Sequence, residues 1–371
     1  MTAIRSENAL IDLLVAGFPR SPLQINATHE SDAELVRLDR ACLPALPAGP
    51  PGPVLAVTID SIEEEIASGL YSDPYMIGWV ACMASLSDLA ATGASPLGLL
   101  MSETLPPDSS EVDLRRLQEG IRDALREAGT FLLGGDTNTG RELRLTGCAV
   151  GIAASHPLRR VGMSPGDILY STGPMGAGNA FALLRLLGDG ATSPPFRPIA
   201  RLAEGKLLSG FASACMDSSD GLFTTLAELM RLNGTGIDLD AGWEACLDDT
   251  AAGIASAHQL PPWCMLAGEH GEYELVFALP PDAIVRLEEL SRATGRTPVR
   301  LGTAAARPGL RANIAGMRVT LDLPAILETV GLARTDPPAC IRGLRAIHDR
   351  MMTESLQNRD RAACPWSDIA V

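Results

Sequence analysis

Aspartate residues recur in five short segments of this chain, and they are its most promising chemical feature. The segments are 29–32 (HESD), 57–60 (VTID), 85–88 (SLSD), 134–136 (GGD) and 217–221 (DSSDG). Each places an aspartate at the end of an apolar stretch or at the start of a helix. Magnesium prefers oxygen ligands and is usually held by carboxylates together with the phosphates of a substrate. The pattern therefore predicts a site with several metal ions that acts on nucleotide phosphates.

Two of these aspartates stand in apolar surroundings. Asp88 lies in the mostly apolar stretch 85–94, and Asp217 ends another. A buried carboxylate is costly unless it is paired, hydrogen-bonded or bound to a metal. The alternative for Asp88 is a charge on the surface of a helix. Ser219 or Asp220 is a natural helix N-cap, but Asp217 has no capping role, so the segment can both cap a helix and bind a metal.

The glycine-rich segments are weaker signals. Gly134, Gly135 and Asp136 directly follow an expected strand at 131–133, where glycine lets backbone N–H groups approach a phosphate. The alternative is an ordinary turn, in which Gly-Asp is common. The run 173–178 is interpreted as a structural strand-to-helix turn. The five histidines show no metal-ligand spacing.

Composition limits the possible partners. The 371 residues carry a net charge of −15, which argues against nucleic acid because phosphate backbones need clustered Lys and Arg. An acidic protein still binds ATP when metal ions neutralise both partners. We find no apolar run of the ~18–20 residues that span a membrane, no CxxC pair and no signal peptide. These features predict a cytoplasmic protein with free thiols.

The elements that must position the aspartates follow from periodicity and turn signals. We expect helices over 74–93, 108–129, 219–232 and 282–295, and strands over 54–59, 131–133, 143–153, 168–172 and 274–278. The boundary between two domains is expected in 161–166. The predicted units are an N-terminal ATP- and metal-binding domain (1–160), a C-terminal domain (161–325) and a C-terminal extension (326–371).

Taken in order, five segments resemble the thiamine-monophosphate kinase family: 86–94, 134–137, 165–173, 216–222 and 271–275. This family belongs to a superfamily with aminoimidazole ribonucleotide (AIR) synthetase, selenophosphate synthetase and the hydrogenase-maturation dehydratase. The resemblance runs from about residue 6 to about residue 302. It implies an α+β, two-domain AIR synthetase-like fold, whose N-terminal sheet domain is used in dimerisation. It also implies a homodimer, ATP and Mg²⁺ as cofactors, and a small-molecule acceptor.

The resemblance also implies roles for individual residues. The metal ligands would be Asp32, Asp60, Asp88, Asp136, Asp217 and Asp220. Among these, the catalytic positions would be Asp88, Asp217 and Asp220. Contacts to ATP would come from Gly134, Gly135, Asp136, Arg160 and Ser219.

Departures from the family pattern concentrate on the substrate side. Ala67 stands where the family has a histidine that meets its substrate, and Gly271 replaces a substrate-side glutamate. Val80 replaces a lysine, and Ser31 replaces the first aspartate of the N-terminal pair. Metal and ATP positions are retained while substrate positions differ. We therefore expect an ATP- and magnesium-dependent phosphoryl-transfer enzyme with an altered acceptor.

Two other functions remain open from the sequence. One is an ATP-dependent synthetase or dehydratase of the same superfamily, which activates an amide or carboxyl oxygen. The dehydratase branch needs a cysteine at its extreme C-terminus, whereas here Cys364 lies before the final segment 368–371. The other is a non-catalytic nucleotide-binding protein, which has no need of so many retained aspartates.

Overall fold

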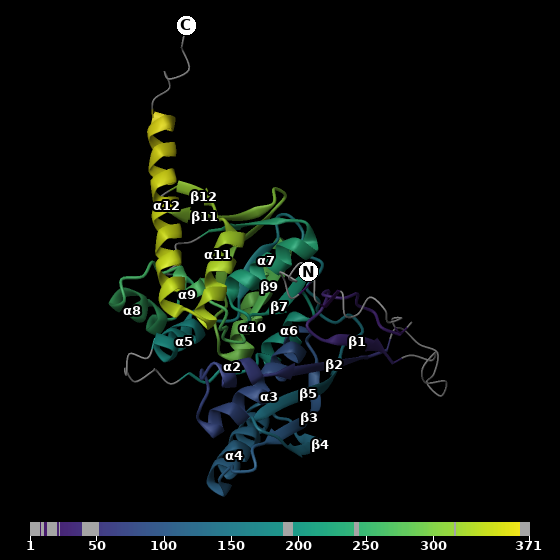
Figure 1. Ribbon diagram of the computed structural model, residues 1–371. Helices are drawn as coiled ribbons and strands as arrows, with labels where there is room; N and C mark the ends of the chain where they lie inside the picture. The colour runs from purple at the N-terminus through teal and green to yellow at the C-terminus, as the bar shows by residue number, and fades with distance from the viewer. Residues whose placement is uncertain are drawn as a thin grey trace.

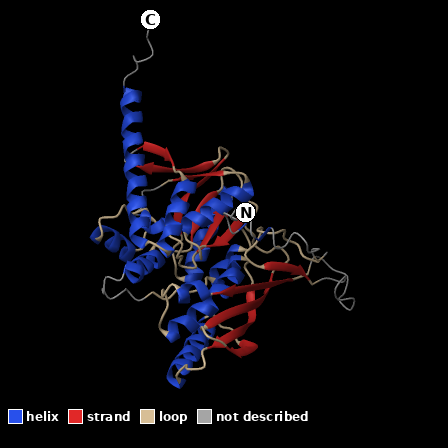
Figure 2. Cartoon of the chain, viewed as in Figure 1, coloured by secondary structure: helices blue, strands red, loops and turns tan. Residues whose placement is uncertain are grey.

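The computed structural model describes residues 8, 11–12, 21, 23–38, 52–187, 196–240, 245–314 and 317–363. Cys364 and the final segment 368–371 lie outside these residues. The strands form one sheet of five and one of seven. Figure 2 shows two groups of strands, each flanked by helices. This mixed architecture with two sheets confirms the expected fold class.

The N-terminal sheet has the order β1-β2-β5-β3-β4. Only the β3–β4 pair is parallel among these neighbours. The helices α3 and α4 pack together, and α3 also contacts β2 and β5 (Figure 1). The elements are β1 (Glu34–Arg37), β2 (Val54–Ser61), α2 (Glu63–Ala67), α3 (Pro74–Ala91), β3 (Ser95–Leu105), α4 (Glu111–Glu127), β4 (Leu132–Thr139) and β5 (Arg144–Ala153).

Helix α3 is buried along most of its length because it lies between the sheet, α4 and α6. Two glycines allow the close approach of α3 and α4. A Cβ on Gly120 would lie 1.9 Å from the carbonyl oxygen of Tyr75, and one on Gly78 would lie 2.2 Å from that of Leu117. Helix α4 is amphipathic, as its sequence predicts, and Ser110 caps its N-terminus by accepting from the N–H of Asp113. The rigid pair holds Asp88, near the end of α3, in place.

The opposite face of this sheet is apolar and exposed. Ile59 pairs with Cys148, which in turn pairs with Leu100, and these three strands present alternate residues outward. Ile59, Leu97 and Leu100 are 70%, 52% and 41% exposed. Leu132 and Leu133 on the edge strand β4 are exposed as well. Helix α3 covers the other face of this sheet, where it contacts β2, β5 and β3.

The second sheet has the order β12-β11-β8-β10-β6-β9-β7. Its largest core cluster includes Phe223, Trp263 and Val276. The strands are β6 (Ile168–Ser171), β7 (Ala214–Asp217), β8 (Gly236–Leu239), β9 (Leu275–Leu279), β10 (Val299–Ala305), β11 (Gly309–Ile314) and β12 (Met317–Thr320). The helices are α5 (Ala177–Leu187), α6 (Leu202–Leu208), α7 (Leu222–Asn233), α8 (Asp249–Ala257), α9 (Cys264–Ala267), η2 (Pro281–Arg286) and α10 (Leu287–Thr294).

The C-terminal extension folds back onto this half of the molecule. It consists of α11 (Leu323–Gly331), η3 (Leu332–Arg334) and α12 (Pro337–Ala363). The first turns of α12 contact α11, η3, α5 and β12, and Cys340, Leu344 and Ile347 are buried there. Farther along, α12 projects beyond the rest of the molecule (Figure 1). In the described residues, no helix is both long and apolar enough to cross a membrane.

Most expected elements are confirmed, with two corrections that concern the site. The expected strand at 131–133 continues to Thr139, so Gly134, Gly135 and Asp136 lie inside β4 and not in a turn after it. The expected helix at 219–232 begins at Leu222, and its N-cap is Gly221 with a φ of 82°. Ser219 and Asp220 therefore precede the helix without capping it. The helix ends at Gly234 in the left-handed conformation, as the sequence predicts.

Candidate functional site

Three of the expected aspartates meet at one point. Asp32 lies just before β1, Asp88 lies in the last turn of α3, and Asp217 ends β7. One carboxylate oxygen from each lies within 4.8 Å of the others. These residues are 185 positions apart at the extremes, and they come from both halves of the fold. The cluster therefore exists only when the two sheets are assembled together.

Neighbouring hydroxyls and one arginine orient these carboxylates. Asp217 accepts from Ser87 Oγ at 2.6 Å and from Ser219 Oγ at 3.1 Å. Asp88 accepts from the hydroxyl of Thr58 on β2. Arg160 Nη2 donates to Asp32 Oδ1 at 2.9 Å. Ser219 and Arg160, both expected to contact ATP, are thus part of the same cluster.

Burial and mutual repulsion disfavour the charged forms of the clustered carboxylates. Burial, together with the charge of Asp32, raises the pKa of Asp217 to about 7. Burial, then Asp217 and Asp60, raise the pKa of Asp88 well above its usual range. Burial opposes the charge on Arg160, but the carboxylate of Asp32 outweighs it and raises the pKa of Arg160. One guanidinium does not neutralise three carboxylates, so a bound cation would stabilise their charged forms.

The donor set fits magnesium. All the candidate ligand atoms are carboxylate oxygens, which is the chemistry that Mg²⁺ prefers. In the described part of the structure, Asp32 Oδ2 is buried and has no hydrogen-bond partner. Buried polar atoms are nearly always satisfied. A cation between Asp32, Asp88 and Asp217 would satisfy this oxygen.

The cluster opens onto a cavity of about 670 Å³. This volume lies in the range of ordinary ligand sites. Six of the expected site residues line it: Asp32, Asp60, Asp88, Arg160, Ser219 and Asp220. Further lining comes from α2, from Tyr71 and Phe181, and from the segment 269–273. The carboxylate cluster therefore adjoins a cavity large enough for a small-molecule ligand.

Gly134, Gly135 and Asp136, which the resemblance implies contact ATP or metal, lie apart from the other aspartates. These residues do not line the cavity. Asp136 is exposed on the edge strand β4, where its carboxylate accepts from Asn138 Nδ2 at 2.7 Å. A Cβ on Gly135 would lie 1.9 Å from the carbonyl oxygen of Met101, so this glycine is required for strand pairing. The roles of the three residues in binding ATP or metal stay predictions.

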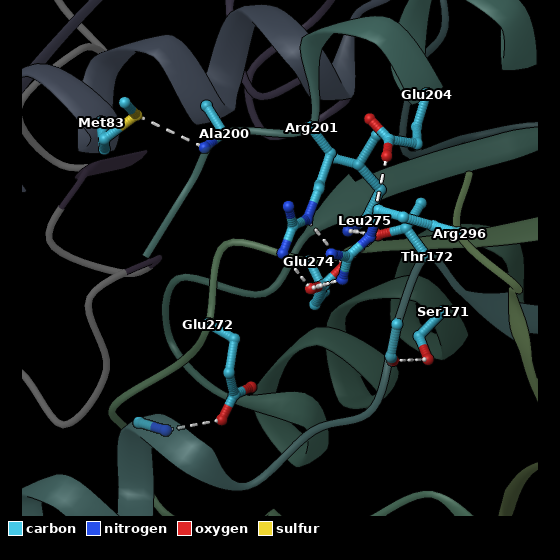
Figure 3. A network of polar contacts seen from close by, with 12 residues as sticks. Met83, Ser171, Thr172, Ala200, Arg201, Glu204, Glu272, Glu274, Leu275 and Arg296 are labelled. Carbon is cyan, nitrogen blue, oxygen red and sulfur yellow. Dashed lines mark hydrogen bonds and ion pairs between the residues drawn. The ribbon is translucent and has the colours of Figure 1, made fainter. Parts of the chain in front are cut away.

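Sequence reasoning missed the buried carboxylate of Glu272. Its Oε1 accepts from the N–H groups of Gly176 and Gly178, at 2.7 and 2.9 Å, at the start of α5. Figure 3 shows this carboxylate pointing at the beginning of the helix. Burial raises the pKa of Glu272 to about 8. The glycine run 173–178 thus binds an internal carboxyl group, and the expectation of a structural turn there agrees with this arrangement.

Glu274 fixes the same segment from the other side. It accepts from Arg201 Nε at 2.9 Å and from Arg296 Nη2 at 2.9 Å, and Thr172 donates to it as well. Figure 3 shows the two arginines converging on this buried carboxylate. Arginine forks are rigid and suit buried carboxylates. The sequence shows charged residues next to apolar strands, which is a signal for such a network. It does not show which arginines pair with Glu274.

Gly271 packs directly against the 217–221 segment. Its N–H donates to the carbonyl oxygen of Ser219 at 2.9 Å. A Cβ at this position would lie 1.4 Å from the carbonyl oxygen of Ser218. The backbone as folded therefore admits no side chain at position 271. The wall of the cavity at 269–273 is held close to the aspartate cluster by this contact.

Comparisons with known proteins agree with this arrangement. Residues 37–153 match the family model "AIR synthase related protein, N-terminal domain". A thiamine-monophosphate kinase of Methanopyrus kandleri is 32% identical over 238 residues, which cover 61% of this chain and 74% of that protein.

Two solved structures show the same fold. The structure of tt0281 from Thermus thermophilus superposes with a TM-score of 0.71 at 28% identity and covers 84% of this chain and 98% of that one. The structure named AaThiL complexed with AMPPCP and TMP has a TM-score of 0.69 at 22% identity and covers 84% of this chain and 94% of that one.

Proposed function

This chain belongs to the thiamine-monophosphate kinase family of ATP-dependent kinases, and on that premise we propose that it is a magnesium-dependent kinase with an altered acceptor. The donor side of the cavity keeps the features that such a reaction needs. Asp32, Asp88 and Asp217 form an all-oxygen cluster, and Arg160 stands beside it. The acceptor side departs from the family pattern.

The observation that carries the altered acceptor is the packing of Gly271. The family resemblance places a substrate-side glutamate at this position. Here a Cβ would lie 1.4 Å from the carbonyl oxygen of Ser218, so the backbone has taken the space that a side chain needs. A glutamate side chain at this position therefore does not fit the backbone as it is folded here. A substrate that depends on that carboxylate loses a polar contact.

Helix α2 supports the same proposal. Ala67, at its end, supplies no imidazole where the family has a histidine. The cavity wall contributed by this helix instead includes Glu64 and Glu65. The polarity of the acceptor side therefore differs from the pattern that the resemblance implies. An acceptor with a different distribution of charge fits these walls.

Phosphoryl transfer of this kind depends mainly on positioning and charge neutralisation, with little need for a protein nucleophile. Mg²⁺ held by Asp32, Asp88 and Asp217 would neutralise charge on the ATP phosphates. Arg160, which donates to Asp32, is placed to add a charge-assisted contact to a phosphate oxygen. Ser87 and Ser219 keep the Asp217 carboxylate in one orientation.

We further propose a homodimer that uses the exposed face of the N-terminal sheet. This face carries Ile59, Leu97 and Leu100, all more than 40% exposed. Exposed apolar patches of this kind mark interaction surfaces. A second copy of the same sheet would bury them. A cytoplasmic location also stays a prediction, and the free thiols among the described cysteines support it.

The test is an ATP-turnover assay with a panel of acceptors and magnesium. Thiamine monophosphate is the reference, and other phosphorylated small molecules form the panel. We expect turnover of at least one panel member to exceed that of thiamine monophosphate by about a hundredfold, the effect of two lost polar contacts. Thiamine monophosphate as the best acceptor would overturn the proposal. A product that carries no phosphate would favour the synthetase or dehydratase alternative.

A further inference from the structure

A second, smaller cavity of about 70 Å³ lies between the second half of the molecule and the C-terminal extension. Its lining is dominated by apolar side chains. On the core side these include Leu183, Leu260 and Met265, and on the extension side Val330, Ile341 and Leu344. An apolar cavity of this kind stays free of water and accepts apolar groups. None of the residues assigned above to the metal cluster lines it.

This cavity shares a wall with the large cavity. Glu269 and His270 line both of them. Asn179 fixes this wall: its Nδ2 donates to the carbonyl oxygen of Met265 at 2.8 Å, and its Oδ1 accepts from the N–H of His270 at 3.0 Å. The two cavities therefore adjoin at this hydrogen-bonded loop, which contains Glu269 and His270. A molecule seated in the large cavity meets the small one at that loop.

The C-terminal extension forms the far wall of this cavity. The family resemblance ends at about residue 302, whereas the far wall is formed by residues of α11, η3 and α12. The packing of α12 on α5 and α11 holds that wall in place. A specificity element added to a kinase core would lie in this position.

We propose that this cavity is a subsite for an apolar group of the acceptor, and that the C-terminal extension selects acceptors that carry such a group. The inference rests on the proposed kinase function and names its substrate class. A cavity of about 150 Å³ accommodates benzene, so one of about 70 Å³ suits an aliphatic group of roughly three or four carbons. A charged group would be excluded because these walls offer it little compensation.

The experiment measures the binding of n-alkyl monophosphates of one to eight carbons by calorimetry, with magnesium and a non-hydrolysable ATP analogue present. Affinity should stay flat until the chain reaches the small cavity. It should then rise about fourfold per methylene, for three or four carbons, because each buried methylene contributes that factor. The total rise is about 60- to 250-fold, and longer chains should gain nothing more.

Two variants test whether the increase in affinity with chain length comes from the small cavity. Ala333→Leu and Cys340→Met fill it from the extension, and both should abolish the rise while leaving methyl phosphate affinity unchanged. Ala346→Leu, on the exposed side of α12, adds the same bulk elsewhere and should behave as wild type. Thermal melting checks that each variant is folded.

Three results would overturn the inference: affinity independent of chain length, a rise that survives in both filled variants, or no binding of any alkyl phosphate. Binding of the magnesium–ATP analogue is measured in the same samples. If it persists in these cases, the kinase proposal stands and only the subsite is wrong. If the analogue itself fails to bind, the proposed function is wrong as well.

Discussion

Ser87 of α3 donates a 2.6 Å hydrogen bond to Asp217 at the end of β7, so the two halves of the molecule meet inside the carboxylate cluster. Both side chains are buried. The segment 85–88 thus contributes twice, because Asp88 is a candidate ligand and Ser87 orients another. The cluster depends on the contact between α3, which packs on the N-terminal sheet, and β7 of the second sheet.

Removing one ligand charge should stop turnover without unfolding the protein. Asp88→Asn and Asp217→Asn each delete a carboxylate from a cluster of three. Both variants relieve repulsion between like charges, so their melting temperatures without metal should equal or exceed that of wild type. ATP turnover measures the loss, and Asp108→Asn, at an exposed position, is the control. Near wild-type activity in both variants would contradict the metal-site assignment.

Loss of the hydrogen bond from Ser87 should weaken the site without destroying it. Ser87→Ala leaves all three carboxylates but frees Asp217 Oδ2 to rotate. A lost bond to a charged group costs about 1.5–3 kcal/mol, so affinity for magnesium–ATP should fall roughly 10- to 100-fold. Calorimetric titration of magnesium and an ATP analogue measures it. Unchanged affinity would mean that Ser219 alone orients Asp217.

A charge on the exposed face of the N-terminal sheet should dissociate the proposed homodimer. Leu100→Asp places a carboxylate in the centre of the apolar face, next to Cys148. Sedimentation should show wild type as a dimer and this variant as a monomer. Val112→Asp on α4, where valine is 72% exposed, is the matched control and should leave the assembly unchanged. A dimeric Leu100→Asp variant would place the interface elsewhere.

The pH dependence of stability should reveal Glu272. Its pKa rises from 4.5 to about 8 on folding, so the folded protein holds the proton more tightly than the unfolded chain. The stabilisation is complete below pH 4.5 and is lost as the pH rises through 8. Each unit of pKa difference corresponds to about 1.4 kcal/mol. Glu272→Gln should therefore flatten the decline in unfolding free energy between about pH 4.5 and 8.

Denaturant unfolding at several pH values measures this effect. Glu288→Gln, at an exposed position of α10, should keep the wild-type profile and is the control. The glutamine carbonyl can still accept from the N–H groups of Gly176 and Gly178, so the variant should be folded. Parallel profiles for wild type and Glu272→Gln would show that this carboxyl titrates normally.

Restoring the family residue should have opposite effects at positions 67 and 271. Ala67→His restores an imidazole at the end of α2 and should raise turnover of thiamine monophosphate about tenfold, the value of one polar contact. Gly271→Glu should instead lower the melting temperature and the activity, because its Cβ would meet the carbonyl oxygen of Ser218. Gain of activity from Gly271→Glu would show that the 269–273 loop is readily rearranged.

The sequence by itself determined the ligand chemistry and much of the local structure. Asp88 and Asp217 follow apolar stretches, and the cost of burying an unpaired carboxylate predicts that they share a charge-compensating site. Local periodicity likewise predicted helices α4 and α7, whereas the capping of α4 by Ser110 was seen only in the structure. The predicted properties depend on neighbours within one or two turns, so the order of residues suffices.

Only the tertiary structure decided which residues meet. Asp136 resembles the other aspartates in sequence, but strand pairing with β3 places it on an exposed edge. The glycine run at the start of α5 resembles a phosphate loop, but Glu272, nearly a hundred residues later, occupies its N–H groups. The sequence shows that Gly271 departs from the family pattern, but only the fold shows that its backbone packs against Ser218. Such pairings depend on long-range register and helix docking, which local periodicity does not encode.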